Sequence, residues 1–362
     1  MSAERDNRNS DDTAWQARAD DTAWQARGTV SRLVLGQMAT QALGTAVRLG
    51  IFDRIGTNNL TATDLARTLA THPQATLRLL RALAGLRLLD EPEPGAFRTT
   101  GAGDLLRSDT TGSMRAMAAM FTDPVMLRAW DLLDEGVRTG ETTFATVFGT
   151  DFFGHLGQHP TLSADFNAAM SQGTRLAAEA APHHYDFARF TTVVDMGGGD
   201  GTLLSAILRT HPGLRGILYD TPEGLAQAPD RLARDGLTDR VELRTGDFVE
   251  SAPSGGDLYL LKSIIHDWND TRCATILRHI REVVPTDGAL LMVEPVLPPT
   301  VPTDQPGTVY LSDLNMLVNV GGRERTEADF RALCTASDFT LRTVTPLPAP
   351  NIFHLIEATP GA

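Results

Sequence analysis

The stretch TVVDMGGGDG at residues 192–201 decides the fold of this chain. Its first five residues, 192–196, have the apolar, β-branched character of a buried strand, and a helical pattern begins at Thr202. Between them lie four glycines, three of them at the alternate positions 197, 199 and 201, which permit the tight turn that lets a ligand approach the backbone at a helix N-terminus. The stretch therefore predicts a ligand-binding turn between a strand and a helix.

Short apolar stretches recur from this turn to the C-terminus, and most are separated by helical patterns. Such alternation is typical of a mainly parallel sheet with helices on both faces. The last two stretches are joined too closely for a parallel crossover, so we expect an antiparallel hairpin at one edge. We predict a doubly wound, Rossmann-like α/β domain over residues 191–362, with strands at 192–196, 216–220, 241–245, 257–262, 289–294, 339–344 and 352–358.

The charges at the glycine turn distinguish two kinds of ligand. Dinucleotide-binding enzymes also use a glycine-rich turn, but a pyrophosphate here would face Asp195 and Asp200, with no cationic residue in the motif. S-adenosylmethionine has no phosphate and carries a cationic ammonium and a cationic sulfonium. Because carboxylates suit those charges, we predict an S-adenosylmethionine site.

Suitable side chains also end the next three predicted strands. Asp220 follows Gly199 by 21 residues (220 − 199), near the spacing at which an acidic residue meets ribose hydroxyls. Taken singly, each carboxylate is an equally good helix N-cap. Their repetition at successive strand ends favours a cofactor site, whose candidate residues are Asp195, Gly197, Gly199, Asp220, Asp247, Phe248 and Lys262, the only lysine of the chain.

Composition limits the class of protein. The 362 residues suit two domains, and the net charge of −13 repels nucleic acid and anionic membranes. No apolar run is long enough to span a bilayer, and the N-terminus lacks the apolar core of a signal peptide. Two cysteines, Cys273 and Cys334, indicate neither a disulfide framework nor a zinc site. We expect a cytoplasmic protein without a metal, a membrane or a nucleic-acid partner.

Three regions precede the sheet domain. Residues 1–27 contain DDTAWQAR twice, and we expect a mobile arm there. Residues 28–110 show helices followed by a small β wing, the outline of a winged helix, which leaves a ligand-binding transcription regulator as a rival class. Residues 111–190 are helical and rich in methionine and aromatic residues. That richness is typical of plain core or of a pocket for a flat apolar ligand, with Met120, Trp130, Phe166, Asn167 and Met170 as candidate substrate contacts.

Several motifs lie beyond the fourth strand, and together they resemble one family. DMGGGDG, YDTPEGL, LKSIIHDWND and GGRERTEADF are similar to motifs of the caffeate- and chalcone-type small-molecule O-methyltransferases, most of all the bacterial members that modify antibiotics. The resemblance extends from about residue 30 to 358. It implies a seven-stranded methyltransferase fold, an N-terminal dimerisation domain, a homodimer, and a small aromatic substrate bearing a phenolic hydroxyl.

The resemblance also implies roles for individual residues. His266 would be the general base, and Glu294 and Glu324 would flank and orient its imidazole. Asp267, Asn315 and Met316 would contribute to the substrate pocket. Three alternatives within enzymes stay open: an N-methyltransferase, a carboxyl methyltransferase, or a relative that performs decarboxylation or hydroxylation instead of methyl transfer.

Overall fold

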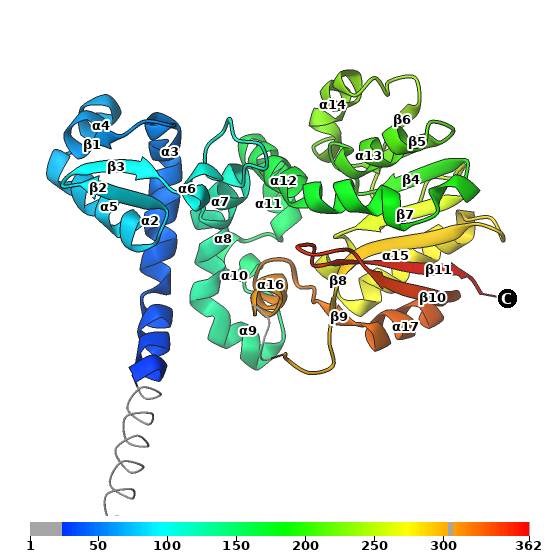
Figure 1. Ribbon diagram of the computed structural model, residues 1–362. Coiled ribbons are helices and arrows are strands. Elements are labelled where there is room, and N and C mark those ends of the chain that lie inside the picture. Colours follow the sequence, from blue (N-terminus) through cyan, green and yellow to red (C-terminus); the bar gives the residue numbers. More distant parts are fainter. Residues whose placement is uncertain (1–23, 303–306, 362) are drawn as a thin grey trace, which may run out of the picture. The chain divides into compact units, whose positions relative to one another are not determined.

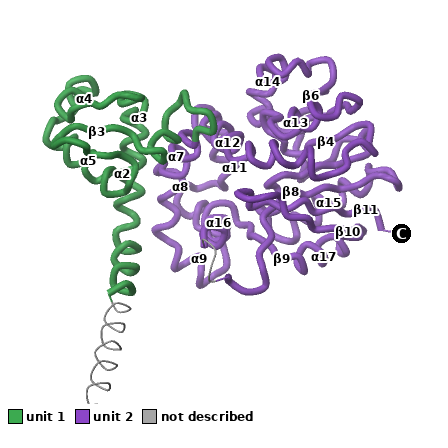
Figure 2. Tube along the Cα trace, viewed as in Figure 1, with its two compact units in different colours: residues 1–113 green, residues 114–362 purple. Residues whose placement is uncertain are grey.

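The computed structural model describes residues 24–302 and 307–361. The predicted mobile arm, residues 1–27, lies outside the described residues except for 24–27, which are helical. The chain forms two compact units, residues 1–113 and 114–362 (Figure 2). The helical region expected at 111–190 and the sheet expected at 191–362 therefore share the second unit, except that residues 111–113 fall in the first.

The first unit combines helices with a three-stranded sheet in the order β1-β3-β2. Thr61 caps α4 by accepting a hydrogen bond from the backbone N–H of Asp64, and Pro73 occupies the first turn of α5. Strands β2 and β3 pair antiparallel and form the predicted wing. The elements are a helix over 24–34, α2 (Gly36–Arg48), α3 (Ile51–Ile55), β1 (Leu60–Thr61), α4 (Ala62–Leu69), α5 (Pro73–Gly85), β2 (Leu89–Glu93), β3 (Ala96–Thr99) and α6 (Gly101–Asp104).

Apolar residues recur at helical spacing from Val30 to Ile51, and the structure buries some of them and exposes others. Val47 and Ile51 are buried, at 2% and 0% exposed. Val30, Val34 and Met38 are 60%, 70% and 68% exposed, although they belong to the same sequence pattern. The helix over 24–34 and α2 thus expose apolar side chains to solvent. An exposed apolar patch of this kind is typical of an interaction surface.

The second unit begins with a helical layer. Its longest member, α12 (Pro160–His184), packs against α7 and α13. The other elements of the layer are α7 (Arg115–Phe121), α8 (Pro124–Leu127), η1 (Arg128–Leu132), α9 (Leu133–Thr139), α10 (Phe144–Phe148), α11 (Phe152–Gln158) and η2 (Phe187–Arg189).

The central sheet of this unit confirms the predicted fold class. Its strands lie in the order β10-β11-β8-β7-β4-β5-β6 (Figure 1). The five strands β8, β7, β4, β5 and β6 are parallel to one another, and β11 is antiparallel to both of its neighbours, β8 and β10. The strands are β4 (Thr192–Met196), β5 (Arg215–Asp220), β6 (Val241–Thr245), β7 (Leu258–Lys262), β8 (Ala289–Leu297), β10 (Phe339–Pro346) and β11 (Phe353–Pro360). The predicted terminal hairpin is present, with β10 outermost.

The sequence did not predict one short strand. β9 (Arg325–Thr326) pairs in parallel with the end of β8, Val296 opposite Arg325. Two residues are too few for an alternating pattern to be visible. This pairing brings the GGRERT segment to the carboxyl edge of the sheet.

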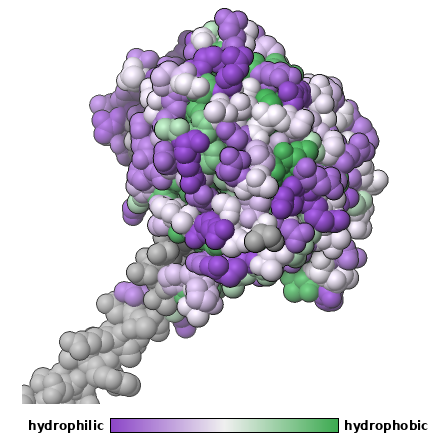
Figure 3. Space-filling view, turned by 90° about the vertical axis from the view of Figure 1, so that its right-hand side faces the viewer, coloured by the Kyte–Doolittle hydropathy of each residue, from purple (hydrophilic) through white to green (hydrophobic). Residues whose placement is uncertain are grey.

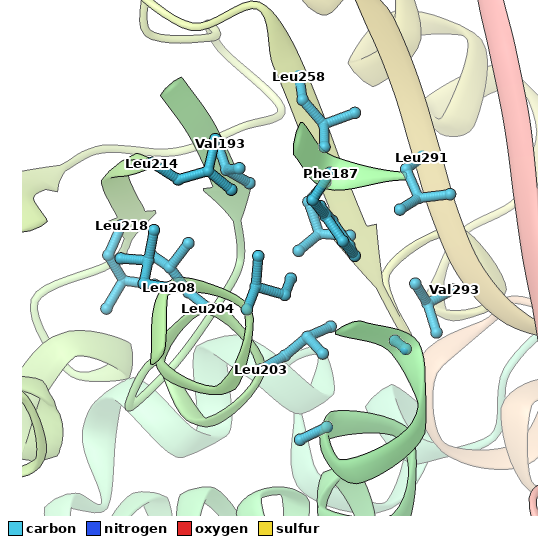
Figure 4. Packing of buried hydrophobic residues seen from close by; sticks show 14 of the residues in the cluster. Phe187, Val193, Leu203, Leu204, Leu208, Leu214, Leu218, Leu258, Leu291 and Val293 are labelled. Carbon is cyan, nitrogen blue, oxygen red and sulfur yellow. The ribbon is translucent and has the colours of Figure 1, made fainter. Parts of the chain in front are cut away.

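Alternating residues of the strands build two cores, one on each face of the sheet. Leu258, Leu291 and Val293 face α12 and α13, and Figure 4 shows Leu204 and Leu208 of α13 packed beside Val193 and Leu218. Residues of the opposite parity face α15 and α17. The covering elements are α13 (Thr202–Thr210), η3 (Gly224–Gln227), α14 (Ala228–Arg234), η4 (Ile265–Asp267), α15 (Asp270–Val283) and α17 (Glu327–Ala336). Two further elements, α16 (Thr308–Asn315) and the η5 turn (Met316–Val320) that follows it, lie apart from these cores, and η5 packs against the helical layer.

Two findings bear on the predicted absences. Among the described residues, no helix is long and apolar enough to cross a membrane, and no group of three or more metal-ligating side chains is assembled. Cys273 and Cys334 are free and buried. On the face shown in Figure 3, apolar residues lie in small groups separated by polar ones.

Candidate active site

The glycine turn joins the ends of the first two strands. The backbone N–H of Gly199 donates to Oδ2 of Asp220 at 2.9 Å, which links the turn after β4 to the end of β5. Gly197 has φ 68°, and a Cβ there would lie 2.5 Å from Cδ1 of Ile264. The turn thus needs glycine both for its backbone conformation and for the close approach of the loop that carries His266.

Asp195 is the buried acid of this turn. It is 1% exposed, and its Oδ2 has no hydrogen-bond partner. Burial and the nearby carboxylate of Asp220 raise its pKa to about 7. Burial also raises the pKa of Asp220, against the hydrogen bonds it accepts from Gly199 and Thr221. An unpartnered acceptor in such a position is suited to a cationic ligand group.

The other acid of the turn, Asp200, is paired within the protein. Its Oδ2 accepts from Nε of Arg231 at 2.8 Å and from the hydroxyl of Ser171 at 2.9 Å, and its Oδ1 accepts from Thr202. A cation absent from the motif therefore comes from α14. Asp200 therefore fastens α12, α13 and α14 together, which leaves Asp195 as the acid of the motif that disfavours a pyrophosphate.

The remaining cofactor candidates follow β6 and β7. The ring of Phe248 lies beside Gly197, where a Cβ would be 3.2 Å from the ring edge, and Oδ1 of Asp247 accepts from the N–H of Val249 at 2.7 Å. Burial lowers the pKa of Lys262 to about 8, against Glu294, Asp267 and Asp195, which raise it. Its Nζ lies 4.7 Å from the ring centre of Phe353.

His266 lies in the loop after β7, where two carboxylates face one side of its ring. Nδ1 is 3.2 Å from Oε1 of Glu324 and 3.8 Å from Oε2 of Glu294. Nε2 lies 3.6 Å from Oδ1 of Asp267, beyond hydrogen-bond range. The side chain is 15% exposed, and Nε2 is the ring nitrogen that does not face Glu294 or Glu324.

The two glutamates hold His266 in different ways. Oε1 of Glu294 accepts from the backbone N–H groups of Ile264 and Ile265, at 2.9 and 2.8 Å, so this carboxylate mainly supports the loop. Glu324 contacts the imidazole directly and accepts from the hydroxyl of Ser312 at 2.9 Å. The second oxygen of each carboxylate is buried without a partner.

This surrounding makes His266 a strong base. Burial disfavours its charged form, but Glu294, Asp267 and Glu324 outweigh that effect and raise the pKa of the imidazole to about 10. Burial likewise raises the pKa of Asp267 to about 7, although His266 opposes it. A hydrogen bond from Nδ1 to Glu324 leaves the lone pair of the neutral ring on Nε2.

The predicted pocket residues form one cluster of methionine and aromatic side chains. Met120 lies inside it at 1% exposed, and Trp130, Phe166 and Met170 pack against it partly buried. Stacking of Phe153 on Trp268, with ring centres 5.3 Å apart, connects the cluster to the His266 loop.

A polar chain lies within this apolar cluster. Oδ1 of Asn315 accepts from Nε1 of Trp130 at 3.3 Å and from Nδ2 of Asn319 at 2.8 Å. Met316, 9% exposed, begins the π-helical turn η5, a conformation frequent at functional sites. One candidate is directed elsewhere, because the amide of Asn167 donates to the carbonyl oxygen of Glu223 and to Gln227.

Trp268 is a site residue that sequence reasoning missed. Its Nε1 is buried without a partner, and its ring lies against Phe153, Phe248 and Arg272. It stands two residues after His266 in the LKSIIHDWND motif, and this proximity could have identified it from the sequence. Ser312 and Arg231 carried no signal, because their roles depend on folding brought about by distant elements.

The doubly wound sheet, the glycine turn and the buried Oδ2 of Asp195, which has no hydrogen-bond partner, together indicate an S-adenosylmethionine-dependent methyltransferase. Comparison with known proteins agrees. Residues 130–340 match the model of the O-methyltransferase domain, and residues 31–109 match that of the O-methyltransferase dimerisation domain. The chain belongs to this O-methyltransferase family, which decides against a ligand-binding winged-helix regulator and against a non-methylating enzyme.

Individual relatives cover nearly the whole chain. O-demethylpuromycin-O-methyltransferase of Streptomyces alboniger is 46% identical over 91% of this chain and 88% of its own length. The solved structure of LaPhzM is 40% identical and has a TM-score of 0.86, covering 92% of this chain and 99% of the other. The O-methyltransferase NcsB1 from neocarzinostatin biosynthesis, solved with S-adenosylmethionine and 2-hydroxy-5-methyl naphthoic acid, is 30% identical with a TM-score of 0.77, covering 89% and 96%.

The titration of Asp195 predicts a pH dependence of cofactor binding. Ionised Asp195 favours a cationic ligand, and in the free protein its pKa is about 7. Affinity for S-adenosylmethionine should therefore increase from pH 5.5 to 7.5, with release of a proton. Calorimetry at both pH values measures it, and Asp195→Asn should bind more weakly and lose most of the pH dependence. An equally steep dependence in Asp195→Asn would assign the titration to another group.

Proposed function

We propose that this enzyme methylates a phenolic hydroxyl of a small aromatic metabolite, with His266 as the general base. The observation that carries the proposal is an imidazole whose Nδ1 faces two buried carboxylates, while Nε2 lies 3.6 Å from Asp267, beyond hydrogen-bond range. The methionine and aromatic cluster around Trp130 supports a flat apolar acceptor. The hydroxylated naphthoic acid bound to the similar enzyme NcsB1 supports the same class of acceptor.

Each part of the site has a task in this mechanism. When bound, S-adenosylmethionine supplies an activated methyl group on a cationic sulfur. His266 Nε2 takes the proton of the acceptor hydroxyl as the oxygen attacks, and the imidazolium that forms stays paired with Glu324. Glu294 holds the loop through two backbone N–H groups. The aromatic cluster excludes water and holds the acceptor ring.

The raised pKa of His266 matters for the proton transfer. A simple phenol has a pKa near ~10 and an ordinary histidine one near ~6.5, so transfer to such a histidine is uphill by about 4.8 kcal/mol. With a pKa of about 10 for His266, the two groups are nearly matched. Transfer of the proton from the hydroxyl to a neutral Nε2 is then nearly isoenergetic, and the fraction of enzyme with the neutral imidazole that the step needs increases as pH rises toward about 10.

Removal of the base should affect turnover more than binding. In His266→Ala we expect kcat to fall by ~10²–10⁴-fold, the range for a positioned acid–base group, with affinity for S-adenosylhomocysteine retained. Steady-state kinetics and calorimetry measure the two effects. The same replacement at His183, which is exposed in the last turn of α12, serves as the control for losing a histidine.

A series of acceptors tests whether the loss concerns proton removal. Phenols of falling pKa are increasingly ionised before they bind and need the base less. The ratio of parental to His266→Ala rates should therefore decrease along the series. A constant ratio would mean that His266 acts by another route, and methylation of amines or carboxylates without dependence on His266 would favour those alternative acceptors.

Glu324 should matter less than His266, because it orients the imidazole and does not take the proton. Glu324→Gln keeps the shape and a hydrogen-bond acceptor but removes the charge that raises the pKa of His266. We expect a smaller loss of kcat, about 10-fold, and a shift of the pH–rate profile toward lower pH. An unshifted profile would contradict this assignment.

We further propose that the enzyme works as a cytoplasmic homodimer assembled through the dimerisation domain. The free, buried cysteines suit a reducing compartment. The exposed apolar face of Val30, Val34 and Met38 supports the dimer. Light scattering should give twice the chain mass, and Val34→Glu with Met38→Glu should weaken association. A stable parental monomer at micromolar concentration would refute the dimer.

A further inference from the structure

The loop that carries His266 starts in a strained conformation. Ser263, the residue after β7, has φ 55°, a left-handed value that L residues rarely adopt. Such a conformation persists only where surrounding contacts determine it. The loop over residues 263–270 therefore requires support, and Glu294 supplies it only at Ile264 and Ile265.

Arg325 supplies support on both sides of His266. Its Nη1 donates to the carbonyl oxygen of Ile265 at 2.6 Å, and its Nη2 donates to that of Trp268 at 2.9 Å. The same Nη2 and Nε donate to Oδ1 of Asp270, at 2.6 and 3.2 Å. Arg325 is 1% exposed, so its guanidinium is almost fully withdrawn from water by these contacts.

The backbone of the neighbouring segment packs directly on the same loop. A Cβ on Gly322 would lie 2.0 Å from the carbonyl oxygen of His266 and 2.6 Å from the backbone nitrogen of Trp268. Only glycine permits this approach. Residues 322–325 thus contact the loop by backbone at Gly322, by the imidazole at Glu324, and by two carbonyl groups at Arg325.

We propose that Arg325 is a positioning residue that fixes the backbone of residues 265–270 and so determines where Nε2 of His266 meets the acceptor hydroxyl. The proposal rests on the proposed role of His266 as base. A planar guanidinium suits the task because its fork of donors can span two carbonyl groups at once, whereas an ammonium is a single point charge. Two residues adjacent in sequence therefore hold different parts of the base: Glu324 contacts the imidazole of His266, and Arg325, the first residue of β9, holds the backbone on either side of it.

Arg325→Lys is the main test, because it keeps the charge opposite Asp270 but loses the fork. We expect kcat to fall by about 10–100-fold, the effect of a misplacement near 1 Å, with affinity for S-adenosylhomocysteine and the KM of the acceptor unchanged. Gly322→Ala should act in the same direction by displacing the loop. Thermal unfolding of each variant shows whether the fold is kept.

Two matched controls accompany these variants. Arg323 also pairs with Asp270, at 3.1 Å, but its side chain is 43% exposed and pairs otherwise with Asp329. Arg323→Gln should therefore leave kcat near the parental value. Gly213→Ala places a methyl group where no atom lies within 4 Å and should also be silent.

A double-mutant cycle separates positioning from general damage. If Arg325 acts through His266, adding Arg325→Lys to His266→Ala should cost no further activity. The pH–rate limb of Arg325→Lys should keep the parental midpoint at a lower plateau. Equal losses in both backgrounds, or a parental kcat in folded Arg325→Lys, would overturn the positioning role alone. A parental rate in His266→Ala would instead overturn the proposed base.

Discussion

The hydrogen bond between Nδ1 of His266 and Glu324 joins two segments that are 58 residues apart, and the site depends on it. It forms because β8 runs through the middle of the arrangement. Most of β8 pairs with β7, whose end leads into the His266 loop. The last residues of β8 pair with β9, which follows Glu324 directly. The same strand carries Glu294, which supports the loop. The proposed base His266, the acid Glu324 and the loop support are therefore all positioned by β8.

The faces of the sheet divide the charges of the site. Alternation along the strands directs Asp195 and Lys262 toward the face that holds α12 and α13, and Glu294 toward the face that holds α15. The acids Asp195 and Glu294 therefore act from opposite faces of the sheet on the buried basic side chains, Glu294 on both Lys262 and His266 and Asp195 on Lys262. In a low-dielectric interior such charges influence one another strongly, as the displaced pKa values of His266 and Asp267 indicate. An excess of acids suits a site that receives a cationic ligand and forms an imidazolium.

The strands, the glycine turn and the terminal hairpin could be predicted because each leaves a local signal in alternation, glycine placement or connection length. The pairing of Asp200 with Arg231 and the clamp of Arg325 on the loop could not be predicted. Both join elements distant in sequence, and neither residue differs in kind from the many other arginines of the chain. The exposure of Val30 could not be predicted either. Apolar residues at helical spacing show which face of a helix is apolar, but they do not show what covers that face.

Stability and catalysis depend on the same carboxylates, with opposite trends in pH. The pKa of His266 is raised in the folded protein, so its contribution to stability is complete below about 6.5 and is lost as pH rises toward about 10. Asp195 and Asp267, both raised to about 7, favour the folded state most when protonated, and that contribution is lost between about 4 and 7. The free site therefore becomes less stable as pH rises, whereas the proton transfer needs His266 without its proton. The loop also has support that does not depend on these carboxylates, because Arg325 donates to the backbone carbonyl groups of Ile265 and Trp268 on either side of His266.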